Sequence, residues 1–180
     1  MFHVFFLGQP RFSIDATPYP FTARPKVLPL LAYLLLHRNT PLARDALAFA
    51  LWTDESESNA RANLRRHLNY LRQALPPQQN APWLLQENQT VQWNPNAPTW
   101  FDVMEFEAQT TDHRKQTTDD AVRRLSSAVA LYQGDLLENV YEDWLVPERE
   151  RLRALYQENL WRLVSLARAR RDFSFALQYA

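Results

Sequence analysis

The sequence contains no cysteine and only two glycines among its 180 residues. Without cysteine the chain forms neither disulfides nor thiolate metal sites, and its composition gives no support to an oxidising compartment. Gly8 and Gly134 are far apart, so a glycine-rich phosphate loop of the P-loop or dinucleotide-binding type cannot be built from them. These absences argue against ATP-driven activity within this chain.

Long hydrophobic runs and an export signal are also missing. The longest apolar run, LPLLAYLLL at residues 28–36, has about half the length that spans a bilayer. The opening residues, MFHVFFLGQPRF, lack the basic region of a signal peptide. The composition is 46% hydrophobic and 13% aromatic, which suffices for a packed core. We therefore expect a soluble cytoplasmic protein with no membrane partner.

The formal net charge of zero conceals a difference between the two halves of the chain. Residues 1–100 hold nine Lys and Arg against six Asp and Glu, whereas residues 101–180 hold eleven against fourteen. The halves thus carry +3 and −3, which indicates two modules with different partners.

The order of sequence patterns predicts two domains, at residues 1–98 and 99–180. In the first, strands are predicted in FHVFFL, RFSID and YPF, followed by a buried helix over 26–39. A second helix is predicted over 40–52, with Thr40 as its N-cap and Pro41 at its first position. A third helix follows at 58–75, and then a hairpin over 83–93.

The second predicted domain is entirely helical. Helices are expected from Asp102, over 118–133 with Thr118 or Asp119 as cap, from Pro147 to about Ala169, and from 172 onward. Their apolar spacing resembles stacked tetratricopeptide (TPR) hairpins, without two clean repeats. The fold class is therefore mainly α with a small β component: a winged helix-turn-helix domain followed by a TPR-like α-helical domain.

The predicted third helix, SNARANLRRHLNYLRQAL, contains four arginines, one histidine and no acid. Its leucines form one apolar stripe at helical spacing. The opposite face carries side chains suited to base edges, because Arg forms a fork to guanine and amides match adenine. We predict that the base-reading residues are Asn59, Arg66, Asn69, Tyr70 and Gln73 and that the phosphate-binding residues are Arg24, Lys26, Arg61, Arg65 and Arg72.

Other functional sites find little support in the sequence. His3, His37 and His67 occur singly and give no metal-ligand spacing, and His113 lies in a polar segment that is typical of a solvated loop. The aromatic residues Tyr141, Trp144 and Trp161 are expected to pack in the core or between helices rather than to form a ligand cage. We expect no catalytic residues, no metal and no cofactor, and hence no enzyme.

Three stretches resemble the SARP family, the antibiotic-regulatory type of bacterial transcriptional activator. They are FFLGQPRFSID, ALAFALWTDESESNARANLRRHLNYLRQALP, and the segment from DVMEFEAQ through ALYQGDLLENVYEDWLVPERERLRALY to DFSFAL. Members of this family join an OmpR-type winged helix to a bacterial transcriptional activator domain (BTAD). The resemblance extends over almost the whole chain.

The resemblance implies a function and assigns roles to several residues. The recognition helix would span Arg61 to Arg72, the wing tip would be Asn88, Gln89 and Thr90, and the loop with Thr53, Asp54 and Glu55 would contact RNA polymerase. Family members bind direct repeats in double-stranded DNA as tandem copies and then recruit polymerase, and self-association is a further possibility. The wing turn ENQT lacks the glycine that is usual in the family.

Two alternatives remain open at this stage. The cationic helix face could be merely solvated, as many such faces are. In the second alternative the chain is a TPR-like protein-interaction scaffold whose winged helix does not bind DNA. A neutral overall charge slightly favours the scaffold, and the salt dependence of binding separates it from a DNA-binding protein.

Overall fold

The structure is a computed structural model that describes residues 1–78, 81–111 and 117–179. Its backbone divides into two compact units. We call the first the winged unit (Met1–His3, Arg11–Thr99 and Val140–Trp144) and the second the helical unit (Val4–Pro10, Trp100–Asn139 and Leu145–Ala180). No helix in the described ranges is both long and apolar enough to cross a bilayer.

Among the described residues, the first sheet contains four strands in the order β3-β2-β1-β7. They are β1 (Phe2–Phe5), β2 (Arg11–Ile14), β3 (Thr17–Pro18) and β7 (Thr99–Phe101). The first two strands confirm the sequence prediction, whereas the third lies before YPF. Asp15 and Ala16 have positive φ angles of 46° and 71° and make a two-residue turn, so pairing with β2 begins at once at Thr17.

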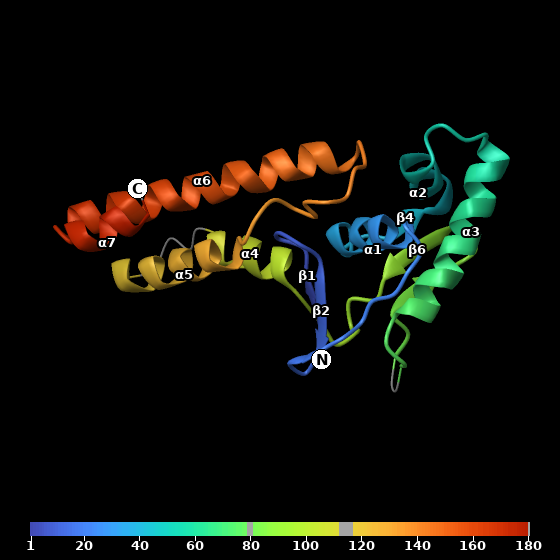
Figure 1. Ribbon diagram of the computed structural model, residues 1–180, viewed down its shortest axis with the longest axis horizontal. Coiled ribbons are helices and arrows are strands. Elements are labelled where there is room, and N and C mark those ends of the chain that lie inside the picture. Colours follow the sequence, from blue (N-terminus) through green and yellow to red (C-terminus); the bar gives the residue numbers. More distant parts are fainter. Residues whose placement is uncertain (79–80, 112–116, 180) are drawn as a thin grey trace. The chain divides into compact units, whose positions relative to one another are not determined.

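Where the structure describes the winged unit, it also contains three helices and a second sheet. The helices are α1 (Val27–Leu36), α2 (Arg44–Leu51) and α3 (Glu57–Ala74), and the sheet has the order β4-β6-β5 (Figure 1). Its strands are β4 (Leu42–Ala43), β5 (Leu84–Gln86) and β6 (Thr90–Trp93). The antiparallel β5–β6 pair confirms the predicted hairpin.

The predicted start of α2 is wrong. Thr40 does not cap the helix, because Leu42 and Ala43 pair with Val91 and Thr90 as strand β4 and delay the helix to Arg44. Backbone pairing with a distant strand thus overrides the local N-cap and proline signal.

Helix α3 matches its prediction closely and has well-defined ends. Ser56 caps it by accepting a hydrogen bond from the Asn59 backbone N–H, and Leu75 is already extended ahead of Pro76. The Tyr19 hydroxyl donates to the Ala74 carbonyl at 2.9 Å, and burial raises the pKa of that phenol. The leucine stripe is buried, as predicted, and consists of Leu64, Leu68, Leu71 and Leu75.

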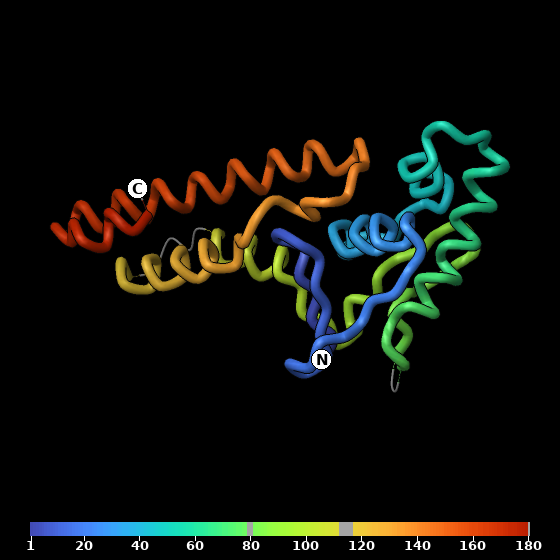
Figure 2. The backbone as a smooth tube through the Cα atoms, viewed as in Figure 1, coloured from blue at the N-terminus to red at the C-terminus, as the bar shows by residue number. Residues whose placement is uncertain are grey.

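In its described residues, the helical unit contains four helices, each of which packs against the next. They are α4 (Asp102–Thr110), α5 (Thr118–Leu131), α6 (Leu145–Ala169) and α7 (Phe173–Gln178). Figure 2 shows the chain reversing direction between α6 and α7. This succession confirms the predicted helical domain.

Three local predictions in this unit are wrong. The segment before Asp102 is not helical but forms strand β7, whose aromatic side chains suit a pleated surface. The cap of α5 is Thr117, which accepts from the Asp120 N–H, rather than Thr118 or Asp119. Helix α6 begins at Leu145, two residues before Pro147, because proline is accommodated in the first turn of a helix.

The aromatic residues expected in the core are divided between inside and outside. Trp144 is half-buried, and its ring lies edge-on to Tyr33 of α1 within the winged unit. Tyr141 and Trp161 are 87% and 75% exposed, so the prediction of core packing is wrong for them. The predicted loop around His113 lies outside the described residues.

Burial of the leucine stripe predicts a strong contrast between neighbouring positions of α3. Leu68→Ala should lower the free energy of unfolding by about 2–5 kcal/mol, because it removes a side chain that is only 3% exposed. Asn69→Ala, one position further along and exposed, should change it by less than about 0.5 kcal/mol. Urea denaturation of both variants measures the difference. Similar losses in both variants would show that the face of α3 is assigned incorrectly.

Candidate nucleic-acid interface

The outward face of α3 gathers the residues that the sequence predicts to read bases. These side chains are exposed or, for Tyr70, half-buried, opposite the leucine stripe: Asn59, Arg66, Asn69, Tyr70 and Gln73. The Asn59 amide donates to the Glu55 carboxylate at 3.2 Å, one turn earlier in the chain. The face therefore combines amides and a guanidinium, the groups that form paired hydrogen bonds with base edges.

Arg65 and Arg66 are the exposed cations of α3 that are not engaged by the protein. Within the described residues, neither forms a hydrogen bond, an ion pair or a ring contact. Their positive charge is therefore available to an external anion.

Arg61, which begins the predicted recognition segment, is held by acids instead. Its Nε and Nη2 atoms donate to the two carboxylate oxygens of Asp45 at 2.8 and 3.1 Å, and Nη2 also reaches Glu57 at 3.2 Å. This hydrogen-bonded pairing lowers the pKa of the Asp45 carboxyl and raises that of the Arg61 guanidinium. The Arg61 and Asp45 side chains are both exposed, so Arg61 can exchange its pairing with Asp45 for a contact to phosphate.

The two cations predicted before α1 have different surroundings. The Arg24 guanidinium lies 4.4 Å from the centre of the Tyr70 ring, so a predicted phosphate ligand stacks on a predicted base-reading residue. The Lys26 ammonium contacts Glu142 at 2.8 Å and donates to the Leu51 carbonyl at 3.1 Å. Arg24 is exposed, whereas Lys26 is engaged within the winged unit.

Arg72 belongs to a cluster that sequence reasoning missed. Its Nη2 donates to the Gln86 side-chain oxygen at 2.6 Å, and Arg44 Nη2 donates to the same oxygen at 3.0 Å. We call Arg44 and Arg72 the arginine pair, and Gln86 is the residue that bridges them. The three residues come from α2, α3 and β5, so no local sequence spacing indicates that they meet.

The wing is a short hairpin turn without basic residues. Asn88 and Gln89 are exposed between β5 and β6, while Thr90 is half-buried as the first residue of β6. The Glu87 N–H donates to the Thr90 carbonyl at 3.2 Å and closes the turn. The wing thus presents amides and one acid to solvent.

The loop between α2 and α3 is acidic. Thr53, Asp54 and Glu55 are all exposed there, and the Glu55 N–H donates to the Trp52 carbonyl at 3.3 Å. The negative charge of this loop contrasts with the positive charge of the α3 face. The loop therefore suits a contact with a protein rather than with a polyanion.

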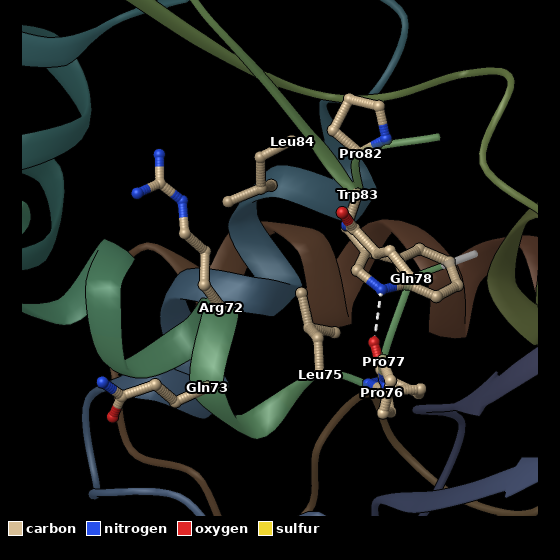
Figure 3. Close-up of a pocket in the computed structure, with 9 residues that line it drawn as sticks. All are labelled: Arg72, Gln73, Leu75, Pro76, Pro77, Gln78, Pro82, Trp83 and Leu84. Atoms are coloured by element: carbon tan, nitrogen blue, oxygen red, sulfur yellow. Dashed lines mark hydrogen bonds between the residues drawn. The ribbon is translucent and has the colours of Figure 1, made fainter. Parts of the chain in front are cut away.

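A cleft of about 380 Å³ lies where α3 ends (Figure 3). In it, the Trp83 indole donates to the Pro76 carbonyl at 2.9 Å and ties the end of the helix to the hairpin. The lining contains prolines, apolar residues and amides around one cation: Arg72, Gln73, Leu75, Pro76, Pro77, Gln78, Pro82, Trp83 and Leu84. This lining positions α3 but offers no carboxylate or histidine for acid–base chemistry.

Two family descriptions match the chain in succession. Residues 20–91 match "Transcriptional regulatory protein, C terminal", and residues 101–173 match "Bacterial transcriptional activator domain". The first contains α1 to α3 and the hairpin up to Val91 in β6, and the second contains α4 to α6.

Individual proteins resemble parts of the chain. The transcriptional regulatory protein EmbR of Mycobacterium bovis and of Mycobacterium tuberculosis is 41% identical over 69 residues, which are 38% of this chain and 18% of those proteins. The solved structure of M. tuberculosis EmbR in complex with a low-affinity phosphopeptide aligns with a TM-score of 0.65 at 23% identity. That alignment covers 94% of this chain and 48% of the EmbR chain, and it shows the likeness of fold.

The chain thus has a winged helix-turn-helix and a BTAD in the same order as the transcriptional activators that its sequence resembles. The two family matches, the EmbR relatives and the shared fold agree, and the chain belongs to the SARP family of transcriptional activators.

Proposed function

We propose that this chain binds double-stranded DNA sequence-specifically through α3 and activates transcription from direct-repeat promoter sites. The observation that carries the proposal is the outward face of α3, where Arg65 and Arg66 have no partner among the described residues beside a row of exposed amides. A helix of this kind suits the major groove, which admits an α-helix and displays a distinct pattern for each base pair.

The proposed contacts divide into two groups. Arg66, Asn69 and Tyr70 read base edges, helped by Asn59 and Gln73. Arg65, Arg72 and Arg24 neutralise phosphates, which fixes position without reading sequence. Arg61 and Lys26 join this second group once phosphate replaces Asp45 and Glu142 as their partners.

The remaining parts of the chain have proposed roles in assembly. The acidic loop with Thr53, Asp54 and Glu55 contacts RNA polymerase, and tandem copies of the chain occupy the two repeats of a site. Residues 99–180 act as the self-association and activation domain, with the proposed boundary at residue 98. Such a regulator works in the cytoplasm, without a cofactor and without catalysing a reaction.

Salt dependence of DNA binding tests the proposal directly. Fluorescence anisotropy with pooled promoter fragments should show a slope of log K against log salt near −5 if about six phosphates are contacted. Some fragments should bind far more tightly than others. Weak binding with a shallow slope would favour the second candidate, a protein-interaction scaffold, for which the 87% exposed Tyr141 and 75% exposed Trp161 are the specific support.

Removal of Arg66 and of Arg65 should have different consequences. Arg66→Ala should cost about 1–3 kcal/mol on the selected fragment and relax one base position, because a base-reading fork is lost. Arg65→Ala should weaken selected and random DNA alike and make the salt slope shallower by about 1. Competition binding against randomised duplexes measures both effects. Equal losses on selected and random DNA for both variants would refute the base-reading role of Arg66.

Release of Arg61 should strengthen DNA binding. Asp45→Asn removes the carboxylate that accepts two of the Arg61 hydrogen bonds and leaves the contact to Glu57, so affinity for random duplex should rise and the salt slope should steepen by up to about 1. Anisotropy titrations at several salt concentrations measure the change.

Asp120→Asn is the matched control, because Asp120 is a half-buried carboxylate paired with Arg123 in the helical unit. The gain from Asp45→Asn should disappear when Arg61→Gln is also present. A gain that persists in the double variant would mean that Arg61 does not bind phosphate.

A further inference from the structure

We propose that Arg44 and Arg72, bridged by Gln86, form a binding site for one phosphate of the DNA backbone at the base of the wing. The inference rests on the proposed DNA-binding function. It adds Arg44 and Gln86, which lie outside the predicted set of DNA contacts, and it assigns a defined partner arrangement to Arg72.

The geometry brings two like charges together. Both Nη2 atoms donate to the same Gln86 oxygen, at 2.6 Å from Arg72 and 3.0 Å from Arg44. An amide oxygen is neutral, so it fixes the two guanidiniums side by side without cancelling either charge. Two guanidiniums that share one acceptor oxygen repel each other, and an anion bound to both of them relieves the repulsion.

Two other cations of the winged unit have acidic partners, whereas Arg44 and Arg72 do not. Arg61 is paired with Asp45, and Lys26 is paired with Glu142. In the part of the chain that the structure describes, neither Arg44 nor Arg72 has an acid within ion-pair distance. The protein therefore leaves a concentrated positive charge at this point of α2, α3 and β5.

The arrangement of Arg44, Arg72 and Gln86 lowers the stability of the folded protein, so stability does not explain why it is present. Arg44 Nε and Gln86 Nε2 are buried without a hydrogen-bond partner. Buried unpaired donors and adjacent like charges both oppose folding, and such exceptions occur preferentially at functional sites. The Arg44 backbone N–H also donates to the Gln89 carbonyl at 2.8 Å, which attaches the start of α2 to the wing turn.

The position of the pair points to the DNA backbone as the source of the anion. The hairpin over 84–93 contains no Lys or Arg, so the wing has no cation of its own for an adjacent phosphate. Arg72 belongs to the same helix as the exposed Arg65 and Arg66, and its guanidinium reaches across to β5. Guanidiniums bind phosphate through paired N–H donors, and Gln86 holds the N–H donors of Arg44 and Arg72 in place for such a contact.

Gln86→Glu tests the site with a nearly isosteric change. A carboxylate at this position pairs with both arginines and cancels one of their two positive charges, so affinity for a random-sequence duplex should fall several-fold. The slope of log K against log salt should become shallower by about 1, because one phosphate is no longer neutralised. The thermal melting temperature should stay unchanged or rise, because two cations gain an ionic partner.

Gln9→Glu is the matched control, since it makes the same change of charge at an exposed position of the helical unit. It should leave the slope unaltered. An equal loss of DNA affinity in Gln9→Glu would overturn the site, because net charge alone would then explain the result.

A second variant covers the case in which Gln86→Glu folds poorly. Arg44→Gln removes one of the two cations and should make the slope shallower by about 1 at unchanged helical circular dichroism. If the unaltered protein shows a salt slope that neither variant changes, the phosphate site is refuted while DNA binding stands. If the unaltered protein shows no salt slope, the proposed function itself fails.

Inorganic phosphate distinguishes a DNA contact from a site for a free anion. The proposal expects random duplex, but not inorganic phosphate, to raise the melting temperature in a way that depends on Gln86. A phosphate-induced shift that Gln86→Glu abolishes, with an unchanged DNA slope, would assign the site to a small anion and overturn the DNA contact.

Discussion

The burial of one leucine stripe determines which side chains this protein can offer to a partner. Leu64, Leu68 and Leu71 pack α3 against α1 and α2, and each is almost completely withdrawn from solvent. Because a helix repeats every 3.6 residues, fixing this stripe also fixes the direction of Arg66, Asn69 and Gln73 on the opposite side. At the end of α3, the hydrogen bond from Tyr19 to Ala74 ties the helix to the segment after β3, and the one from Trp83 to Pro76 ties it to the hairpin.

Much of this could be predicted from the sequence, because the decisive signals are local. The leucine spacing, Ser56 before the helix and Pro76 after it determine α3 with little help from the rest of the chain. The same holds for the hairpin, whose apolar flanks enclose a polar turn. The family resemblance added the identity of the two domains, which residue patterns alone do not supply.

Several of the failures occurred where distant segments meet. Strand β4 forms because Val91 and Thr90 are available to pair, and nothing near Leu42 indicates this. The meeting of Arg44, Gln86 and Arg72 is of the same kind, since three elements contribute one residue each. Likewise, the pairing of Arg61 with Asp45 joins α3 to α2, so a count of acids within α3 could not reveal that this cation is already engaged.

These pairings also explain how a chain of zero net charge can carry a locally cationic surface. At physiological ionic strength, charges further apart than about 8 Å are largely screened, so a phosphate responds to its near neighbours and not to the total. In the winged unit, Asp45 and Glu57 form ion pairs with Arg61, Glu142 pairs with Lys26, and Asp15 pairs with the N-terminal ammonium. These acids are thus paired with a subset of the cations of this unit, and Arg65, Arg66 and the bridged arginine pair keep their full charge. The placement of the carboxylates, more than the number of arginines, defines the surface that we assign to DNA.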